Sequence, residues 1–78
     1  MKLNRNNKYT IEIGDQLKFS ESEVYTVTTI IPVRNGVNFT LRDVKTGQTI
    51  YSNPSSQCYG AEVIKAKANR GAGATYSD

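Results

Sequence analysis

The side chains best suited to chemistry in this 78-residue sequence are its cations and its tyrosines. Three cations stand near the start of the chain and three near its end, namely Lys2, Arg5, Lys8, Lys65, Lys67 and Arg70. Arg34 stands in a turn-rich stretch, and Tyr51 and Tyr59 fall where we expect partly exposed rings. Cations attract phosphates without reading a base sequence, and an exposed tyrosine ring can stack on a base or contact a peptide. These residues are therefore the candidate binding residues.

Catalysis has few possible carriers in this sequence. The chain contains no histidine, which excludes Ser–His and Cys–His nucleophile pairs and imidazole acid–base chemistry. The only cysteine, Cys58, has no basic neighbour in sequence that would activate it, so we predict a buried side chain rather than a nucleophile. The carboxylates are scattered over predicted loops and outward positions, and zinc would need clustered Cys or His. We expect a protein that is not an enzyme and has no cofactor, metal or small-molecule substrate.

The composition is that of one small, mildly basic domain. Ten Lys and Arg against seven Asp and Glu give a net charge of +3, well below the charge density of a strong nucleic-acid binder. An ordinary soluble surface explains such a charge equally well. No stretch is apolar enough for a membrane span, residues 1–7 lack the apolar core of a secretion signal, and one cysteine allows no internal disulfide. We expect a cytoplasmic protein that does not contact membranes.

The elements that must position the candidate residues centre on three β-type runs. The first, Val24–Ile31, is almost wholly β-branched or aromatic, which favours a strand. The triplet Arg34–Gly36 predicts a hairpin turn, with a residue tolerant of left-handed backbone next to a glycine. Phe39–Val44 alternates apolar and polar residues, Lys45–Gly47 predicts a second hairpin with Gly47 at positive φ, and Thr49–Tyr51 returns. The sequence thus predicts a three-stranded antiparallel meander.

Two further strands flank this meander. The alternation from Tyr9 to Ile13 predicts a first strand, and after a turn at Gly14–Asp15 the inward face resumes at Leu17. Pro32 marks an edge, a bulge or a strand end, because proline cannot donate a hydrogen bond. Residues 52–60 form a connector with room for a 3₁₀ turn, and residues 61–66 are a last strand or, alternatively, a short helix. Tyr9 faces inward, and the predicted core contains Ile11, Ile13, Leu17, Phe19, Val27, Phe39, Leu41, Ile50 and Val63.

The two ends of the chain are expected to lie outside the folded domain. Residues 1–8 are polar, basic and rich in asparagine, which predicts a flexible arm, and residues 67–78 predict a disordered tail. The domain itself spans residues 9–66. In a small β-barrel the first and last strands are neighbours. If these strands form one, the six cations of the two ends could meet on one side of the domain.

Five short strands with one long loop, two tight hairpins and a 3₁₀-like connector describe an all-β, SH3-like small barrel. The run Ile13–Phe19, followed by the meander, Asn53–Pro54 and a last strand, resembles the chain plan of KOW- and Tudor-type modules. In those modules a Gly–Asp opening such as Gly14–Asp15 commonly precedes the first barrel strand. The resemblance implies a binding module.

Two functions remain open for such a module. In the first, the protein binds nucleic acid, weakly and without sequence preference, or sits on a nucleic-acid machine. In the second, it is a protein-binding accessory factor or inhibitor that uses a sheet edge or an aromatic groove to block or redirect a host protein. A small, histidine-free single domain is similar in composition to the accessory proteins that bacteriophages encode.

Overall fold

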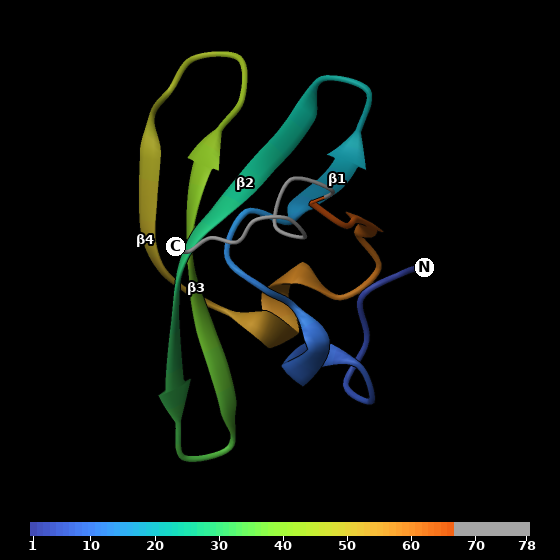
Figure 1. Cartoon of the computed structure of the whole chain (residues 1–78), viewed down its shortest axis with the longest axis vertical. Helices are drawn as coiled ribbons and strands as arrows, with labels where there is room; N and C mark the ends of the chain where they lie inside the picture. The colour runs from blue at the N-terminus through green and yellow to red at the C-terminus, as the bar shows by residue number, and fades with distance from the viewer. Residues whose placement is uncertain (67–78) are drawn as a thin grey trace.

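The protein, seen in a computed structural model that describes residues 1–66, is a single five-stranded antiparallel sheet with two 3₁₀ turns (Figure 1). The elements in chain order are η1 (Lys8–Thr10), β1 (Gln16–Ser20), β2 (Glu23–Val33), β3 (Gly36–Asp43), β4 (Thr49–Pro54), η2 (Ser55–Cys58) and β5 (Glu62–Ile64). The strand order is β4-β3-β2-β1-β5. The prediction of an all-β domain with five antiparallel strands is confirmed. The predicted disordered tail, with Lys67 and Arg70, lies outside the described residues.

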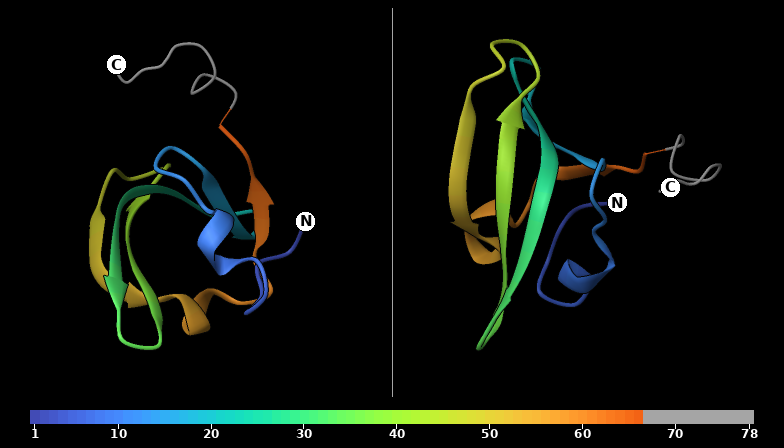
Figure 2. Two further views of the ribbon diagram at one scale, coloured as in Figure 1. Left: turned by 60° about the horizontal axis from the view of Figure 1, so that its bottom comes forward. Right: turned by 60° about the vertical axis from the view of Figure 1, so that its left-hand side comes forward.

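The sheet curls around its core, and its outer strands β4 and β5 do not pair with each other (Figure 2). Strand β2 carries the bend. It pairs with β1 through its first residues and with β3 along its length, and the register with β3 shifts between Val27 and Thr29. The extra residue there, Thr28, donates its hydroxyl to the Thr40 carbonyl at 3.2 Å. A bulge of this kind increases strand twist, which lets one long strand serve both halves of the sheet.

The core fills the inside of this curl. Its buried apolar residues are Leu3, Ile11, Leu17, Val27, Val37, Phe39, Leu41, Cys58, Ala61 and Val63. Three predicted core residues are wrong, because Ile13, Phe19 and Ile50 are 57%, 40% and 39% exposed. Ile13 lies in the loop before β1, whereas Phe19 and Ile50 stand beside irregularities in strand pairing. Alternation along the sequence does not anticipate such irregularities.

The N-terminal residues correct the expectation of a flexible arm. Leu3 is only 1% exposed, its N–H donates to the Ala61 carbonyl at 2.9 Å, and its carbonyl accepts from Gly60 at 2.8 Å. The Val63 N–H donates to the Met1 carbonyl at 2.7 Å. Residues 1–3 therefore cover the free edge of β5. They pair its backbone hydrogen-bonding groups and at the same time bury the apolar Leu3 side chain.

The predicted first strand from Tyr9 to Ile13 is absent, and η1 occupies its start. Asparagine side chains hold the backbone of this segment in a turn. The Asn4 side-chain oxygen accepts hydrogen bonds from the Asn6 and Asn7 N–H groups at 2.8 and 3.1 Å. Such local hydrogen bonds compete with strand formation. Ile11 enters the core, but Tyr9 is 65% exposed, which corrects its inward assignment.

The pair Gly14–Asp15 has a structural role. Gly14 has φ of 101°, a conformation that favours glycine, and its N–H donates to the Val27 carbonyl at 2.8 Å. The Asp15 side chain is fully buried and accepts from the Glu12 N–H at 2.8 Å and the Ala66 N–H at 2.9 Å. The same carboxylate accepts from the Lys65 ammonium. It therefore links the entry of β1 to the segment that follows β5.

Both predicted hairpins form, with one difference in detail. Gly47 has the expected positive φ of 79°, but neither Arg34 nor Asn35 adopts a positive φ at the β2–β3 turn. Strand β2 also continues through Pro32 to Val33. At Pro32 only β3 borders β2, so one edge of the strand has no ladder partner and proline is tolerated.

Candidate functional site

Three segments that are distant in sequence converge at one end of the domain. They are residues 4–10, residues 33–38 at the β2–β3 turn, and residues 54–60 around η2; we call their surface the basic end. Strand β3 contacts both η1 and η2. A Cβ added to Gly36 would lie 3.6 Å from the Lys8 Cε atom and 3.6 Å from the Ser55 Oγ atom. The β2–β3 turn points down toward this end in Figure 1.

The basic end carries cations and no carboxylates. Arg5, Lys8 and Arg34 belong to its segments, and those segments contain no Asp or Glu. The Lys8 ammonium donates to the Arg5 carbonyl at 3.2 Å and lies 5.0 Å from the centroid of the Tyr9 ring. A cation over an aromatic face keeps its charge at the surface, where it can attract an anion.

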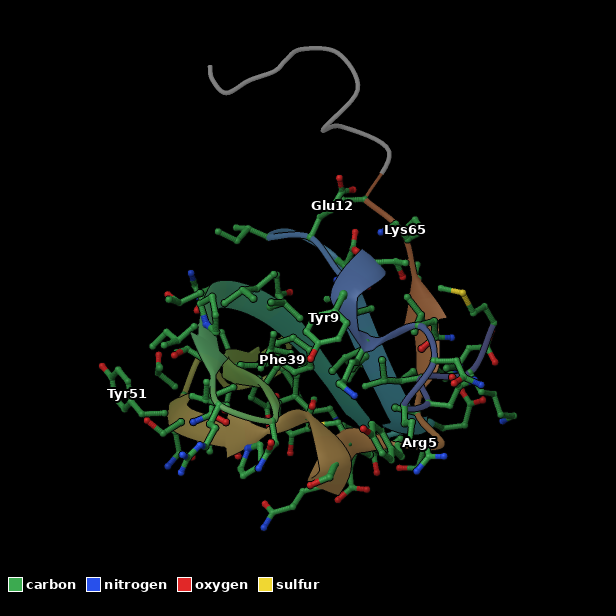
Figure 3. The ribbon with its side chains drawn as sticks, turned by 90° about the horizontal axis from the view of Figure 1, so that it is seen from below. Arg5, Tyr9, Glu12, Phe39, Tyr51 and Lys65 are labelled. Carbon is green, nitrogen blue, oxygen red and sulfur yellow. The ribbon has the colours of Figure 1, made fainter. Side chains whose placement is uncertain are left out.

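Two tyrosines join these cations. Tyr59 is 37% exposed and lines a shallow hollow of about 210 Å³ together with Asn35 and Ser56. Tyr9 is 65% exposed and lies over the middle of the basic end in Figure 3, which looks onto it. Tyr59 lies in the connector, as predicted. Tyr9 is not among the predicted binding residues, because the alternation pattern assigns it to a strand with its ring facing inward. The asparagines that precede Tyr9 are the signal that favours a turn instead.

The remaining predicted binding residues lie elsewhere. Tyr51 is 75% exposed on the edge strand β4 and projects outward, far from Arg5 and Tyr9 (Figure 3). Lys2 forms an isolated β-bridge with Glu62. Thus, among the described residues, only part of the predicted set belongs to the segments of the basic end: Arg5, Lys8, Arg34 and Tyr59.

Lys65 borders the basic end at Thr10 and has two carboxylate partners in the protein. Its ammonium contacts Asp15, donates to the Thr10 carbonyl at 2.9 Å, and lies 3.4 Å from a Glu12 carboxylate oxygen. Glu12 and Lys65 stand side by side in Figure 3. Two carboxylates offset this charge, so Lys65 serves the fold rather than a phosphate. The predicted meeting of cations from both ends does not extend to Lys65.

The ionisable groups with shifted pKa values, Cys58 and Glu62, have structural surroundings that account for the shifts. Cys58 is buried, as predicted, and burial raises the pKa of its thiol, which disfavours a reactive thiolate. The N-terminal ammonium donates to Glu62 at 2.8 Å and lowers the pKa of that carboxyl. Within residues 1–66 no three His, Cys, Asp or Glu side chains gather as a metal site would require. The described segments also contain no helix long and apolar enough to cross a membrane.

A second feature is a cavity of about 210 Å³ between the β1–β2 hairpin and β4, which we call the mouth cavity. Its lining consists of Phe19, Glu23, Tyr25, Leu41, Ile50, Asn53, Gln57 and Cys58. The Phe19 and Tyr25 rings meet edge to face, with centroids 5.8 Å apart at 76°. It shares no lining residue with the hollow beside Tyr59.

Fold and surface together define a small all-β domain with a basic end and an apolar cavity. Comparison of this chain with protein-family models, with curated proteins and with solved structures finds no match. The resemblance to KOW- and Tudor-type modules stays a prediction, and Gly14–Asp15, which carries it, is accounted for by the backbone turn and the buried carboxylate.

Proposed function

We propose that this protein is a non-catalytic binding module that holds the phosphate backbone of a nucleic acid at its basic end. One observation carries the proposal: folding places the segments that contain Arg5, Lys8 and Arg34 at one end of the domain, and these segments contain no carboxylate. By contrast, Lys18 lies 3.3 Å from a Glu21 carboxylate oxygen, and Lys65 has Glu12 and Asp15 as partners. A patch with uncompensated positive charge favours a polyanion.

The expected mode of binding follows from the residue types. Arginine and lysine attract phosphates and release bound counterions, so affinity falls steeply with salt and does not depend on base sequence. The exposed rings of Tyr9 and Tyr59 add faces on which unpaired bases can stack, which favours single strands. We expect a dissociation constant of roughly 10⁻⁴–10⁻⁶ M at physiological salt.

The cellular role in this proposal is that of an accessory protein. The resemblance to KOW-type modules supports a place on nucleic acid or on a nucleic-acid machine in the cytoplasm. The likeness in size and composition to bacteriophage accessory proteins supports a role in redirecting such a machine. Both likenesses concern the fold or the composition, and neither names a partner.

The test is a salt titration of oligonucleotide binding by fluorescence anisotropy, with single-stranded and duplex probes. The variant Arg5→Gln/Lys8→Gln/Arg34→Gln should reduce the salt slope by about two units for single strands and nearly three for duplex DNA. The matched control is Lys18→Gln/Arg42→Gln/Lys45→Gln, which removes the same net charge from other elements. The control should retain most of the slope. Equal losses in both variants, or no binding by the wild type at low salt, would contradict the proposal.

The second candidate function is capture of a protein, such as a host enzyme. A different observation favours it, namely the mouth cavity with its half-exposed Phe19 and Ile50. Protein interfaces use aromatic side chains and apolar pockets of this kind as anchors. Binding of that sort should survive nuclease treatment and should be indifferent to the three substitutions at the basic end.

A further inference from the structure

Irregular strand pairing marks two walls of the mouth cavity. In β1 the register with β2 runs from Lys18 opposite Val24 to Ser20 opposite Glu23, which leaves Phe19 as an extra residue. Between β3 and β4, Leu41 pairs with Ile50 and Phe39 pairs with Asn53. The β4 side of this interval therefore has one residue more than the β3 side. This second irregularity includes Ser52, whose φ of 57° is unusual for a residue with a side chain.

Bulges at barrel rims re-aim side chains and are common beside functional sites. Here the residues next to them, Phe19 and Ile50, have the types of core residues but are about 40% exposed. Both line the mouth cavity. The fold therefore holds two large apolar side chains at the surface across one cavity.

The chemistry of the cavity is apolar inside and acidic at one wall. Leu41 and Cys58, each only 3% exposed, contribute its apolar interior. Glu23 is the one charged residue among its described lining residues, and it forms no ion pair within residues 1–66. A carboxylate at this position repels phosphate and attracts a cation. The volume of about 210 Å³ is below that of a drug-sized pocket, roughly 300–1,000 Å³, and suits a single side chain.

Polar groups in the lining offer partners to a peptide backbone. The Asn53 side-chain nitrogen donates to the Phe39 and Ile50 carbonyls at 3.3 and 2.9 Å, which fixes the amide and leaves its oxygen as an acceptor. Gln57 supplies a second amide. Convergent polar groups around an apolar interior are typical of a recognition site.

We propose that the mouth cavity binds a peptide segment of a partner protein, inserting one aliphatic side chain and placing a neighbouring lysine or arginine against Glu23. This inference rests on the second candidate function and names the chemistry of the partner. The apolar lining selects the aliphatic group, and the carboxylate selects the adjacent cation.

The experiment is a two-dimensional amide NMR titration of the whole protein with capped tetrapeptides. The probe contains adjacent leucine and arginine, in either order, between glycines; one control replaces arginine by glutamate and the other replaces leucine by serine. Shifts should concentrate at Phe19, Glu23, Tyr25 and Ile50. The glutamate control should bind several-fold more weakly at low salt, and the serine control should produce no saturable shifts.

Substitutions within the mouth cavity can be compared with matched substitutions outside it. Glu23→Gln should weaken binding of the leucine–arginine probe several-fold and remove its salt dependence, whereas Glu21→Gln, a matched change at the hairpin tip, should have little effect. Phe19→Ala should weaken binding about tenfold or more, whereas Val44→Ala, at a residue 54% exposed outside the cavity lining, should not. Because Glu23 is exposed, its variant remains informative even if Phe19→Ala does not fold.

The same spectra distinguish failure of this inference from failure of the nucleic-acid function. Oligonucleotide shifts within residues 4–10 and 33–38 and peptide shifts at Phe19, Glu23 and Ile50 are expected to occur independently; Gln57 and Cys58 belong to both surfaces and are left out of this comparison. Peptide shifts that are absent, that lie elsewhere, or that ignore Glu23→Gln would overturn the inference. Saturable oligonucleotide shifts at Phe19, Glu23 or Ile50 would also overturn it, because they would assign the mouth cavity to nucleic acid.

Discussion

The buried carboxylate of Asp15 should be the most sensitive polar group of the fold. It accepts three hydrogen bonds, from the Glu12 and Ala66 N–H groups and from the Lys65 ammonium. Hydrogen bonds to a charged partner contribute about 1.5–3 kcal/mol each, but the Lys65 side chain is 37% exposed, so water can replace part of the loss. We take about 1–1.5 kcal/mol for each bond, which gives about 3–4.5 kcal/mol for Asp15→Ala.

That loss is large for a domain of 78 residues, whose free energy of unfolding is about 4–12 kcal/mol. At about 4–8 °C per kcal/mol, Asp15→Ala should lower the melting temperature by roughly 12–36 °C. The assay is thermal and urea denaturation followed by circular dichroism. Glu12→Ala is the control, because it removes the exposed carboxylate partner of Lys65 and should cost no more than about 1 kcal/mol. An Asp15→Ala protein that melts like the wild type would refute the structural role of this residue.

Four other changes test separate parts of the structure. Leu3→Ala should lower the free energy of unfolding by about 2–5 kcal/mol in urea denaturation, because Leu3 is a core residue. An unchanged denaturation midpoint would support the prediction that residues 1–8 are a flexible arm. Tyr9→Ala should leave stability nearly unchanged but weaken single-strand binding by about 1–3 kcal/mol in anisotropy titrations, with no effect on duplex binding. Lys65→Gln should lower the melting temperature and leave the oligonucleotide salt slope intact; a slope reduced by a full unit would return Lys65 to the interface. The Glu62 pair with the N-terminal ammonium lowers the carboxyl pKa, so its stabilising contribution is present above the ordinary glutamate pKa and is lost as pH falls through the lowered value. A carbon-detected NMR titration of Glu62 measures this, and a pKa at the ordinary value would contradict the pair.

Local sequence patterns predicted the central meander correctly because its strands are dense in β-branched residues and its hairpins carry strong turn residues. Val24–Ile31, Phe39 and Gly47 behave as their residue types dictate. The same alternation rule failed at Tyr9–Ile13, where asparagine hydrogen bonds formed a turn instead. It also failed at Phe19 and Ile50, because an extra residue in a strand cannot be read from the pattern on one strand alone.

The candidate site could be predicted only in part because it depends on contacts between distant segments. Arg5, Lys8 and Arg34 are ordinary surface cations in the sequence, and the close approach of Lys8 to Gly36 places their segments at one end of the domain. Lys65 was assigned to the site because it is a cation near the last strand. Its partner Asp15 lies 50 residues away, which no local pattern indicates.

The central claim is that nucleic acid binds at the basic end, and the most direct measurement is an amide NMR titration of the wild-type protein with a short oligothymidylate at low salt. The predicted result is saturable shifts within residues 4–10, 33–38 and 54–60, which diminish as salt is added. Tyr51 on β4 and the mouth-cavity residues that lie outside the basic end, namely Phe19, Glu23, Tyr25 and Ile50, should remain unchanged. No shifts at low salt, or shifts centred on β4 or the mouth cavity, would contradict the claim.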